Sequence, residues 1–188
     1  MIAGSKKSFF FPERNEILYY YMGYPLKSQA RVISPFGSAQ GIAIQKAGEK
    51  SARKLGPFLP PCQKECHWAS GYLGGFQLLP GKSHKWIALL NASPTAPNHD
   101  ITEVWTEEPP PSLGGFAWCD EDFPVRNWRL ADEPMEWIDD LPAAAVANGE
   151  GTNMWRHHLL ALPDGRAAIY YNSGYYGQEQ LYMVFADV

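Results

Sequence analysis

One pattern occurs three times along this chain: an apolar stretch, a polar turn that contains a proline, and a second apolar stretch. The three copies occupy residues 9–23, 76–93 and 158–174. The middle turn reads Pro-Gly and the last reads Pro-Asp-Gly, and these residues favour a tight reversal between antiparallel strands. The repetition therefore predicts three β-hairpins and a fold assembled from copies of one unit.

Further apolar segments follow the hairpins and extend this unit. The candidates for a third strand are residues 38–48, 100–106 and 177–188. The candidates for a fourth strand, which stop at a proline, are residues 53–60 and 127–135. The sequence thus predicts antiparallel sheets of four strands in repeat units at about 9–60, 72–140 and 155–188, the last without its fourth strand.

Several of these strands are apolar at nearly every position, as at 167–171 and 181–185, which is typical of sheets buried on both faces. Four-stranded antiparallel sheets stacked face to face around an axis form a β-propeller. We therefore predict an all-β, propeller-like single domain over residues 1–188, with about two and a half to three blades. A β-sandwich of similar hairpins is the alternative, and a short helix is expected only at 142–149.

The number of units has a consequence for assembly. Propellers typically have about four to eight blades, so three units do not close a ring. An open stack would expose an apolar sheet face, and a large exposed apolar face usually marks an interface. We therefore expect a homo-oligomer, most simply a dimer. Two alternatives stay open: the chain is a fragment of a larger propeller, or N-terminal residues complete the third sheet.

The blade motifs resemble those of a known group of enzymes. Residues 41–57 keep Gly41, Ala43, Gly48, Gly56 and Pro57, and they follow the Tyr-rich stretch "LYYYMGYP" at 18–25. With "WRHHLLALPDGRAAIYYNSG" at 155–174, they resemble blades of the five-bladed β-propeller glycoside hydrolases. That broad group includes arabinanases, fructosidases and mannoside phosphorylases. The shared motifs build blades, so they carry fold more than chemistry.

The resemblance implies cleavage of glycosidic bonds by carboxylates around a central funnel. In that group an acidic residue usually stands at the head of an innermost strand, whereas this chain has no Asp before Phe9. The first functional hypothesis is therefore a glycoside hydrolase with an aromatic-lined funnel. The alternative is a non-catalytic subunit that binds carbohydrate or forms oligomers.

The candidate site residues stand at the heads of the innermost strands and at the starts of the third strands, where Gln40 also lies. A Trp face stacks on a pyranose, polar side chains bond its hydroxyls, and two carboxyl groups divide the acid and base work. The candidate catalytic residues are Glu103 and Glu150. The candidate substrate-binding residues are His67, Trp68, Asn153, Trp155, Arg156, His157, Gln178 and Glu179.

Each of these residues also has a purely structural interpretation. Trp68 and Trp155 suit a hydrophobic core as well as a sugar platform. His157 and His158 alternate across a strand, so only one of them can face the axis. Glu150 suits a solvated loop. The acidic run at 120–122 is expected to be a surface turn.

Charge and hydropathy exclude two kinds of partner. The net charge is −4 and the 16 Lys and Arg residues are scattered, so we expect no nucleic-acid partner. No apolar run is long enough to span a bilayer, and Phe9–Phe11 are too few for the core of a signal peptide. We therefore expect no membrane partner and favour the cytoplasm.

The cysteines bear on metal binding. Their odd number, three, argues against a full disulfide framework. Cys62, Cys66 and Cys119 could form a zinc site with His67, but their spacing is not a common zinc pattern. We therefore expect reduced thiols, no metal and no cofactor.

Overall fold

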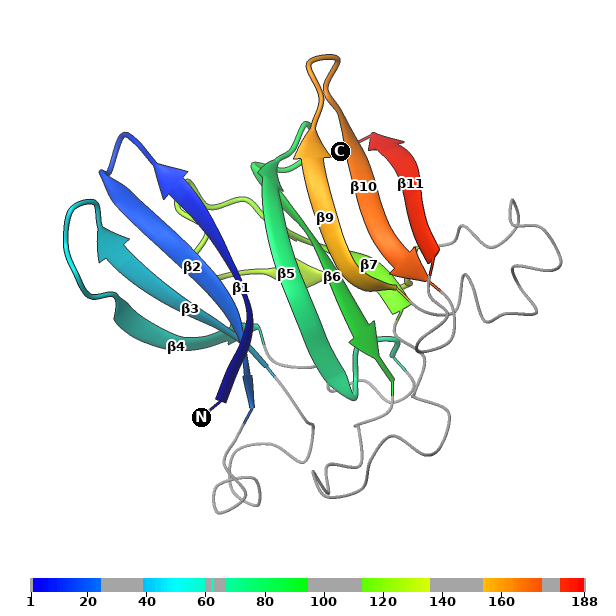
Figure 1. The fold of residues 1–188 in the computed structure, drawn as a ribbon, viewed down its shortest axis with the longest axis horizontal. Helices are drawn as coiled ribbons and strands as arrows, with labels where there is room; N and C mark the ends of the chain where they lie inside the picture. The colour runs from blue at the N-terminus through cyan, green and yellow to red at the C-terminus, as the bar shows by residue number, and fades with distance from the viewer. Residues whose placement is uncertain are drawn as a thin grey trace, which may run out of the picture.

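The computed structural model describes residues 2–24, 39–59, 62, 67–94, 113–135, 154–173 and 180–187, and the regular structure within them is entirely β-strand. Figure 1 shows three antiparallel sheets, coloured blue to cyan, green to yellow, and orange to red along the chain. The all-β prediction is confirmed. The short helix expected at 142–149 lies outside the described residues.

Sheet 1 contains four antiparallel strands in chain order: β1 (Ile2–Phe11), β2 (Glu16–Tyr24), β3 (Ala39–Lys46) and β4 (Arg53–Leu59). The first predicted hairpin is present, and Phe11 pairs with Glu16 at its closed end. Asn15 occupies the left-handed region in this turn with a φ of 52°, which Asn tolerates better than most residues.

Sheet 2 repeats this order with β5 (Tyr72–Pro80), β6 (Trp86–Ser93), β7 (Leu113–Cys119) and β8 (Arg129–Leu130). The prediction of a third strand at 100–106 is wrong, because β6 pairs with Leu113–Cys119 instead. The true strand contains Gly114 and Gly115, which resemble a loop in the sequence. Gly115 is needed there, because a Cβ atom would overlap the indole of Trp68.

Sheet 3 contains β9 (Trp155–Ala161), β10 (Arg166–Ser173) and β11 (Gln180–Asp187), with β10 in the centre. Its hairpin turns at Gly165, which has a φ of 83° and so occupies a conformation that suits glycine. The apolar run of β11 predicts burial on both faces, but the burial alternates along the strand. Leu181, Met183 and Phe185 are exposed, while the residues between them pack on the core.

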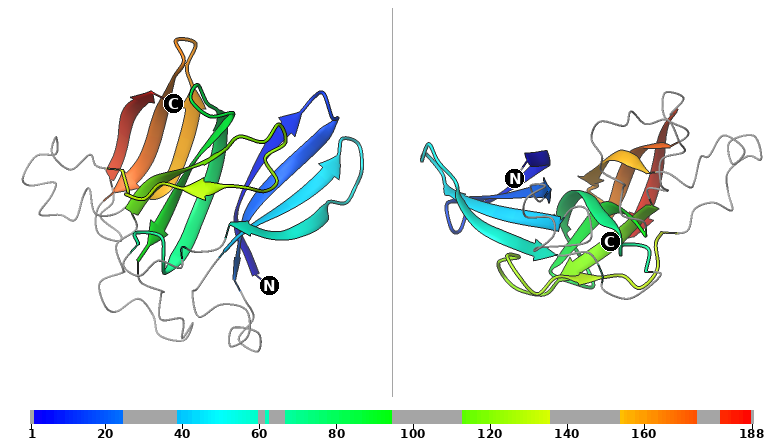
Figure 2. Two further views of the ribbon diagram at one scale, coloured as in Figure 1. Left: turned by 180° about the vertical axis from the view of Figure 1, so that it is seen from behind. Right: turned by 90° about the horizontal axis from the view of Figure 1, so that it is seen from below.

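The sheets pack face to face, with sheet 2 between the other two (Figure 2). β5 contacts β1, β2 and β3 on one side and β9 on the other. Within the described residues, the sheets do not close into a barrel. Both a propeller-like stack and a sandwich are compatible with this arrangement.

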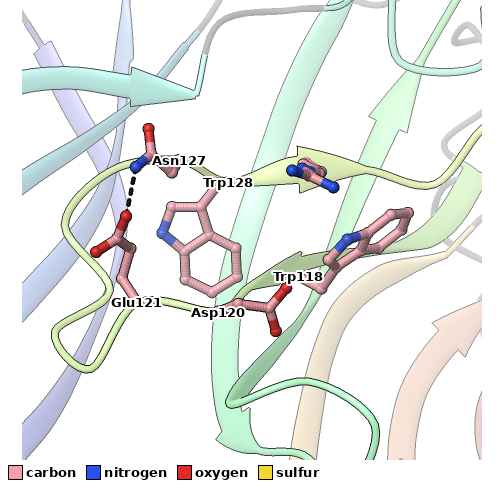
Figure 3. A pocket seen from close by; sticks show the side chains of 6 residues that line it. Trp118, Asp120, Glu121, Asn127 and Trp128 are labelled. Atoms are coloured by element: carbon pink, nitrogen blue, oxygen red, sulfur yellow. Dashed lines mark hydrogen bonds between the residues drawn. The ribbon is translucent and has the colours of Figure 1, made fainter.

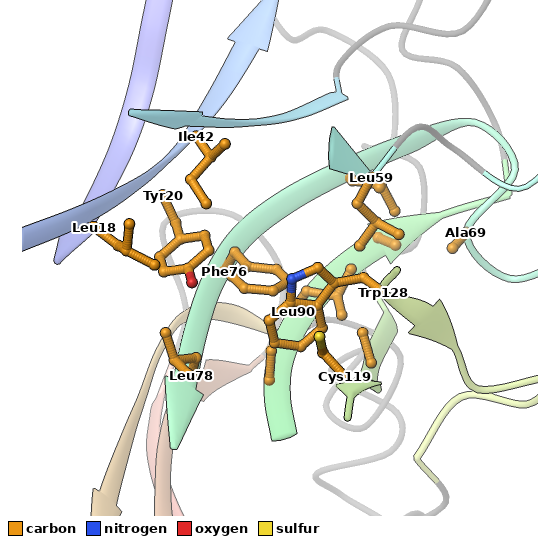
Figure 4. Packing of buried hydrophobic residues seen from close by; sticks show 14 of the residues in the cluster. Leu18, Tyr20, Ile42, Leu59, Ala69, Phe76, Leu78, Leu90, Cys119 and Trp128 are labelled. Carbon is orange, nitrogen blue, oxygen red and sulfur yellow. The ribbon is translucent and has the colours of Figure 1, made fainter. Parts of the chain in front are cut away.

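Aromatic and aliphatic side chains together fill the core between sheets 1 and 2, as Figure 4 shows. Phe76 of β5 lies at the centre of this core. The centre of its ring is 5.0 Å from the centre of the Tyr20 ring and 4.9 Å from that of the Trp128 ring. The polar groups of Tyr20 and Trp128 share one hydrogen-bond acceptor. The Tyr20 hydroxyl and the Trp128 Nε1 both donate to the carbonyl of Pro124. Burial raises the pKa of Tyr20 well above its usual value, so the hydroxyl stays a donor.

A second core lies between sheets 2 and 3. Its buried members are Leu79, Leu89, Met154, Leu159, Ala167, Ile169 and Tyr171. The two sheets are also joined by a pair of reciprocal hydrogen bonds: Gln77 Nε2 donates to the carbonyl of Leu159, at 2.8 Å, and the backbone N–H of Leu159 donates to Gln77 Oε1, at 2.9 Å. This pair fixes the position of β9 along β5 in the neighbouring sheet.

The central position of Phe76 leads to a stability prediction. Phe76→Ala would remove a fully buried ring that three other aromatic rings contact. We expect the free energy of unfolding, measured by urea denaturation, to fall by about 3–5 kcal/mol. Phe10→Ala is the matched control, because Phe10 is 49% exposed on sheet 1, and it should change stability by less than about 1 kcal/mol. Equal losses in the two variants would contradict this account of the core.

Candidate functional site

One end of the stack is defined by the starts of β3, β5, β7, β9 and β11 and by the ends of β2, β6 and β10, and we name it the strand-start end. In Figure 1 it is the lower end of the three sheets. The three hairpin turns, at 12–15, 81–85 and 162–165, lie at the opposite end. The two ends therefore differ in construction.

Buried polar side chains collect toward the strand-start end. Among the described residues, the buried polar side chains are Gln40, His67, Asn91, Ser93, His157 and Ser173. Gln40 and His157 lie within the first three residues of their strands. Asn91, Ser93 and Ser173 lie within the last three residues of theirs, and His67 precedes β5. All three sheets contribute. Burying polar groups costs free energy, so their concentration at one end calls for a chemical reason.

Gln40 is fully buried at the start of β3. Its Nε2 donates to the carbonyls of Leu73, at 3.3 Å, and Gly74. These carbonyls are available because the pairing of β5 with β6 is interrupted between Leu73 and Phe76. Its other polar atom, Oε1, is buried without a hydrogen-bond partner in the described part of the chain.

Asn91 holds the same irregular stretch of β5 from the other side. Its Oδ1 accepts a hydrogen bond from the backbone N–H of Gly75, at 2.6 Å. Gly74 must be glycine for this approach, because a Cβ atom there would overlap the Asn91 amide. The two amide side chains thus bind the same peptide group of β5, Gln40 at the Gly74 carbonyl and Asn91 at the Gly75 N–H.

His157 approaches from β9 and is 3% exposed. Its Nε2 lies 3.2 Å from the carbonyl of Leu89, and a carbonyl can only accept, so Nε2 carries the proton. Nδ1 is then a lone-pair acceptor, and it is buried with no hydrogen-bond partner among the residues described. The nearby backbone of Gly75 raises the pKa of His157 by favouring the protonated imidazole. It nevertheless forms no hydrogen bond with Nδ1.

The protonation of His157 follows from its surroundings. Burial lowers its pKa from 6.5 to about 4, and the positive charge of Lys7 on β1 acts in the same direction. The carbonyls of Leu89 and Gly75 oppose this shift only in part. The imidazole is therefore neutral at pH 7.

His67 and Trp68, two of the predicted binding residues, point into the core. The Trp68 indole is 4% exposed and donates from Nε1 to the carbonyl of Ala131, at 2.8 Å. His67 Nε2 lies 3.1 Å from the same oxygen, and His67 Nδ1 accepts from the backbone N–H of Ala69. Both side chains fasten the start of sheet 2 to the segment after β8.

The remaining predicted site residues are described only in part. Glu103, Glu150, Asn153, Gln178 and Glu179 lie outside the described residues. Trp155 and Arg156 begin β9, and their backbone alone is described. Of the predicted set, the structure therefore places His157 against β5, where Gln40 also binds.

Sequence reasoning missed Asn91 at this end and Lys7 in the middle of β1. Asn91 could have been recognised in the sequence, because it is a polar residue that interrupts the apolar run of β6. Lys7 could have been found by alternation, since it shares a face of β1 with Phe9 and Phe11. Its approach to His157 depends on the packing of separate sheets.

The described cysteines and histidines bear on the zinc alternative. In the described ranges, no three His, Cys, Asp or Glu side chains lie close enough to hold a metal ion. Cys119 is buried and its thiol donates to the carbonyl of Arg126, while Cys66 lies outside these ranges. The described segments also contain no helix of the length and hydropathy needed to cross a membrane.

The buried neutral imidazole predicts a pH dependence of stability. Between pH 6.5 and pH 4 the unfolded chain binds a proton at His157 and the folded chain does not, so stability falls as the pH falls. The loss over this window should be about 3 kcal/mol. His157→Gln should remove this part of the slope in urea denaturation series, whereas His158→Gln, at an exposed neighbour, should keep it. An unchanged slope in His157→Gln would contradict the buried neutral state.

Comparisons with known proteins bear on the fold. No protein-family model matches the sequence, and no curated protein matches it either. Among solved structures, the chain is similar to Zg3597, a family 117 glycoside hydrolase produced by the marine bacterium Zobellia galactanivorans, with a TM-score of 0.63 and 12% sequence identity. The match covers 98% of this chain and 51% of that one, so this chain spans about half the length of the hydrolase. At this identity the likeness shows a shared fold.

Proposed function

We propose that this protein is carbohydrate-active and that it works as a glycoside hydrolase at the strand-start end of a propeller-like stack. One observation carries the proposal: Gln40 Oε1 and His157 Nδ1 are buried acceptors without partners among the described residues. Gln40 binds the carbonyls of Leu73 and Gly74 on β5, and His157 lies 3.2 Å from the carbonyl of Leu89 on the neighbouring β6. The fold shared with a glycoside hydrolase supports the same class of ligand.

The type of unpartnered atom narrows the ligand chemistry. Both atoms are neutral acceptors, so each needs an O–H or N–H donor. Carboxylate and phosphate oxygens are acceptors too and would be repelled, whereas sugar hydroxyls donate readily. A ligand rich in hydroxyl groups, or water molecules that such a ligand displaces, would satisfy both atoms.

The proposed catalytic residues are Glu103 and Glu150. By chain connection, the segment with Glu103 joins the end of β6 to the start of β7, and the segment with Glu150 precedes β9. Both segments therefore leave the sheets at the strand-start end. One carboxyl group would protonate the leaving oxygen while the other acts as base or nucleophile.

Arg156 would hold one of these carboxyl groups in its ionised form, since a nearby positive charge lowers a carboxyl pKa. The second, in a drier place beside Trp155, would keep its proton and serve as the acid. Asn153, His157, Gln178 and Glu179 would bond sugar hydroxyls. Two carboxyl groups about 5 to 10 Å apart would fit either stereochemical outcome.

The catalytic assignment predicts a large effect of one small change. Glu103→Gln removes the charge and keeps the shape, so hydrolysis should slow by at least ~100-fold while folding and sugar binding survive. A panel of nitrophenyl glycosides identifies the substrate and then measures the rate. Glu13→Gln, in the exposed turn between β1 and β2, is the matched control and should keep full activity.

Two outcomes decide between the hypotheses. If Glu103→Gln and Glu150→Gln both keep wild-type activity, the catalytic assignment is wrong. If the wild type cleaves no glycoside of the panel but binds sugars on a glycan array, the non-catalytic binding protein replaces the enzyme.

A specific observation also favours an oligomer-forming subunit. Leu160, Leu181, Met183 and Phe185 are 49–71% exposed on one face of sheet 3. Their register places them on one face, because Ala168 of β10 lies opposite both Leu160 and Phe185, and Tyr170 lies opposite Met183. The face also carries His158, opposite Tyr170, and the Arg166 guanidinium, 5.1 Å from the centre of the Phe185 ring. Large exposed apolar side chains gathered on one face usually mark an interface.

We propose that a second copy of this chain covers this face. Sheet 2 covers the facing sides of both neighbouring sheets, so another sheet is the partner that fits a flat apolar face. Three strands of about seven residues cover roughly 14 by 23 Å, or about 640 Å² for both copies, so the contact would have to extend beyond these strands to reach the roughly 1,000 Å² of a specific interface.

The dimer is tested by sedimentation velocity at micromolar concentration. The wild type should sediment as a dimer, and Met183→Glu should sediment as a folded monomer, because a buried carboxylate is costly. Phe10→Glu places the same charge at an exposed position of sheet 1 and should stay dimeric. A monomeric wild type, or a dimer unaffected by Met183→Glu, would overturn this assembly.

A further inference from the structure

A pocket of about 470 Å³ lies over the outer strands of sheet 2, away from the strand-start end. Figure 3 shows it between the end of β7, the following loop and β8. Trp118 is the sixth of the seven residues of β7, so it lies near the end opposite to the proposed catalytic site. The residues that line the pocket are Trp118, Asp120, Glu121, Asn127, Trp128 and Arg129.

Trp118 is held in a fixed orientation at this pocket. The His84 ring stacks on the indole at 5.3 Å, with 20° between the planes. His84 is held in turn by Asp120, whose Oδ1 lies 3.1 Å from Nδ1. Trp118 also lines a smaller depression of about 160 Å³ with His84 and Phe116, so the indole separates two hollows. An aromatic ring at such a boundary is suited to stacking.

Polar groups of three kinds surround the indole. Asp120 presents a carboxylate, which its hydrogen bond from His84 keeps ionised by lowering its pKa. Asn127 donates from Nδ2 to the Glu121 carboxylate, which leaves the amide oxygen as an acceptor (Figure 3). The Arg129 side chain is exposed and forms no hydrogen bond or ion pair with a described residue, although its charge contributes to the lowered pKa of Asp120. The pocket therefore combines donors and acceptors.

This mixture disfavours several ligand classes. A phosphate or nucleotide would meet the carboxylates of Asp120 and Glu121, and a cation would be attracted by these carboxylates but repelled by the guanidinium of Arg129, so no charged ligand matches the whole pocket. A purely apolar ligand would leave these polar groups without water. A neutral ring with an apolar face and hydroxyl groups at its edge satisfies both the indole and the polar groups.

We propose that this pocket binds a neutral saccharide, with one pyranose ring stacked on Trp118 and its hydroxyls bonded by Asp120, Asn127 and Arg129. This site is separate from the proposed catalytic site, and it would hold a sugar chain on the outer surface of sheet 2. It does not depend on the protein being an enzyme.

The test uses ¹⁵N-labelled protein titrated with cellohexaose, maltohexaose, laminarihexaose and xylohexaose. At least one should shift the indole N–H signal of Trp118. Trp118→Ala and Arg129→Gln should each weaken that binding by at least ~10-fold. Phe10→Ala, which removes an exposed ring from sheet 1, should bind as the wild type does. Arg129 is exposed, so its variant remains informative if Trp118→Ala folds poorly.

Failure of the whole panel to shift the Trp118 signal would overturn the proposal, as would binding that survives both substitutions. The two proposals fail separately. Glu103→Gln should keep the Trp118 shift, and Trp118→Ala should keep any hydrolysis of a small nitrophenyl glycoside. A Trp118→Ala protein without hydrolytic activity would show that the pocket is part of the catalytic site, which contradicts a separate site.

Discussion

The packing of β5 between two other sheets is the contact on which the rest of the structure depends. On one side Phe76 enters an aromatic group with Tyr20 and Trp128, and on the other Gln77 exchanges hydrogen bonds with Leu159. Buried aromatic pairs contribute beyond their area because their edges and faces attract. Since β5 touches four strands of the neighbouring sheets, its position fixes where the strand-start ends meet.

The same strand explains the polar end of the stack. β5 is regular where it packs on aromatic rings and irregular between Leu73 and Phe76, where its peptide groups leave the ladder. Gln40 and Asn91 bind these peptide groups, and His157 lies against them. Satisfying the irregular backbone uses one polar atom of Gln40, and the second is left over. A buried hydrogen-bond acceptor without a partner lowers the stability of the folded protein. A ligand that donates a hydrogen bond to this acceptor removes that loss.

The sequence predicted what depends on local chemistry. The hairpins follow from prolines and glycines at the turns, such as Gly165, and the strands follow from apolar runs. The third strand of sheet 2 was misplaced because Gly114 and Gly115 resemble a loop, and the reason for Gly115 is the distant Trp68 ring. His157 was predicted as a site residue, but its neutral buried state depends on β1 and β6. The Trp118 pocket was missed although its lining residues all lie between 118 and 129, because the acidic run at 120–122 was interpreted as a surface turn; only His84, which stacks on Trp118, comes from a distant turn.

The central claim is that the strand-start end is built to receive hydroxyl groups, and the imidazole of His157 reports on it directly. Long-range ¹H–¹⁵N spectra of the labelled protein at pH 7 should show a neutral ring with the proton on Nε2. When a saccharide identified on the glycan array is added, the Nδ1 resonance should shift to the position of a hydrogen-bonded acceptor, while Nε2 stays unchanged. A charged ring at pH 7, or an Nδ1 resonance that does not respond to a bound sugar, would contradict the claim.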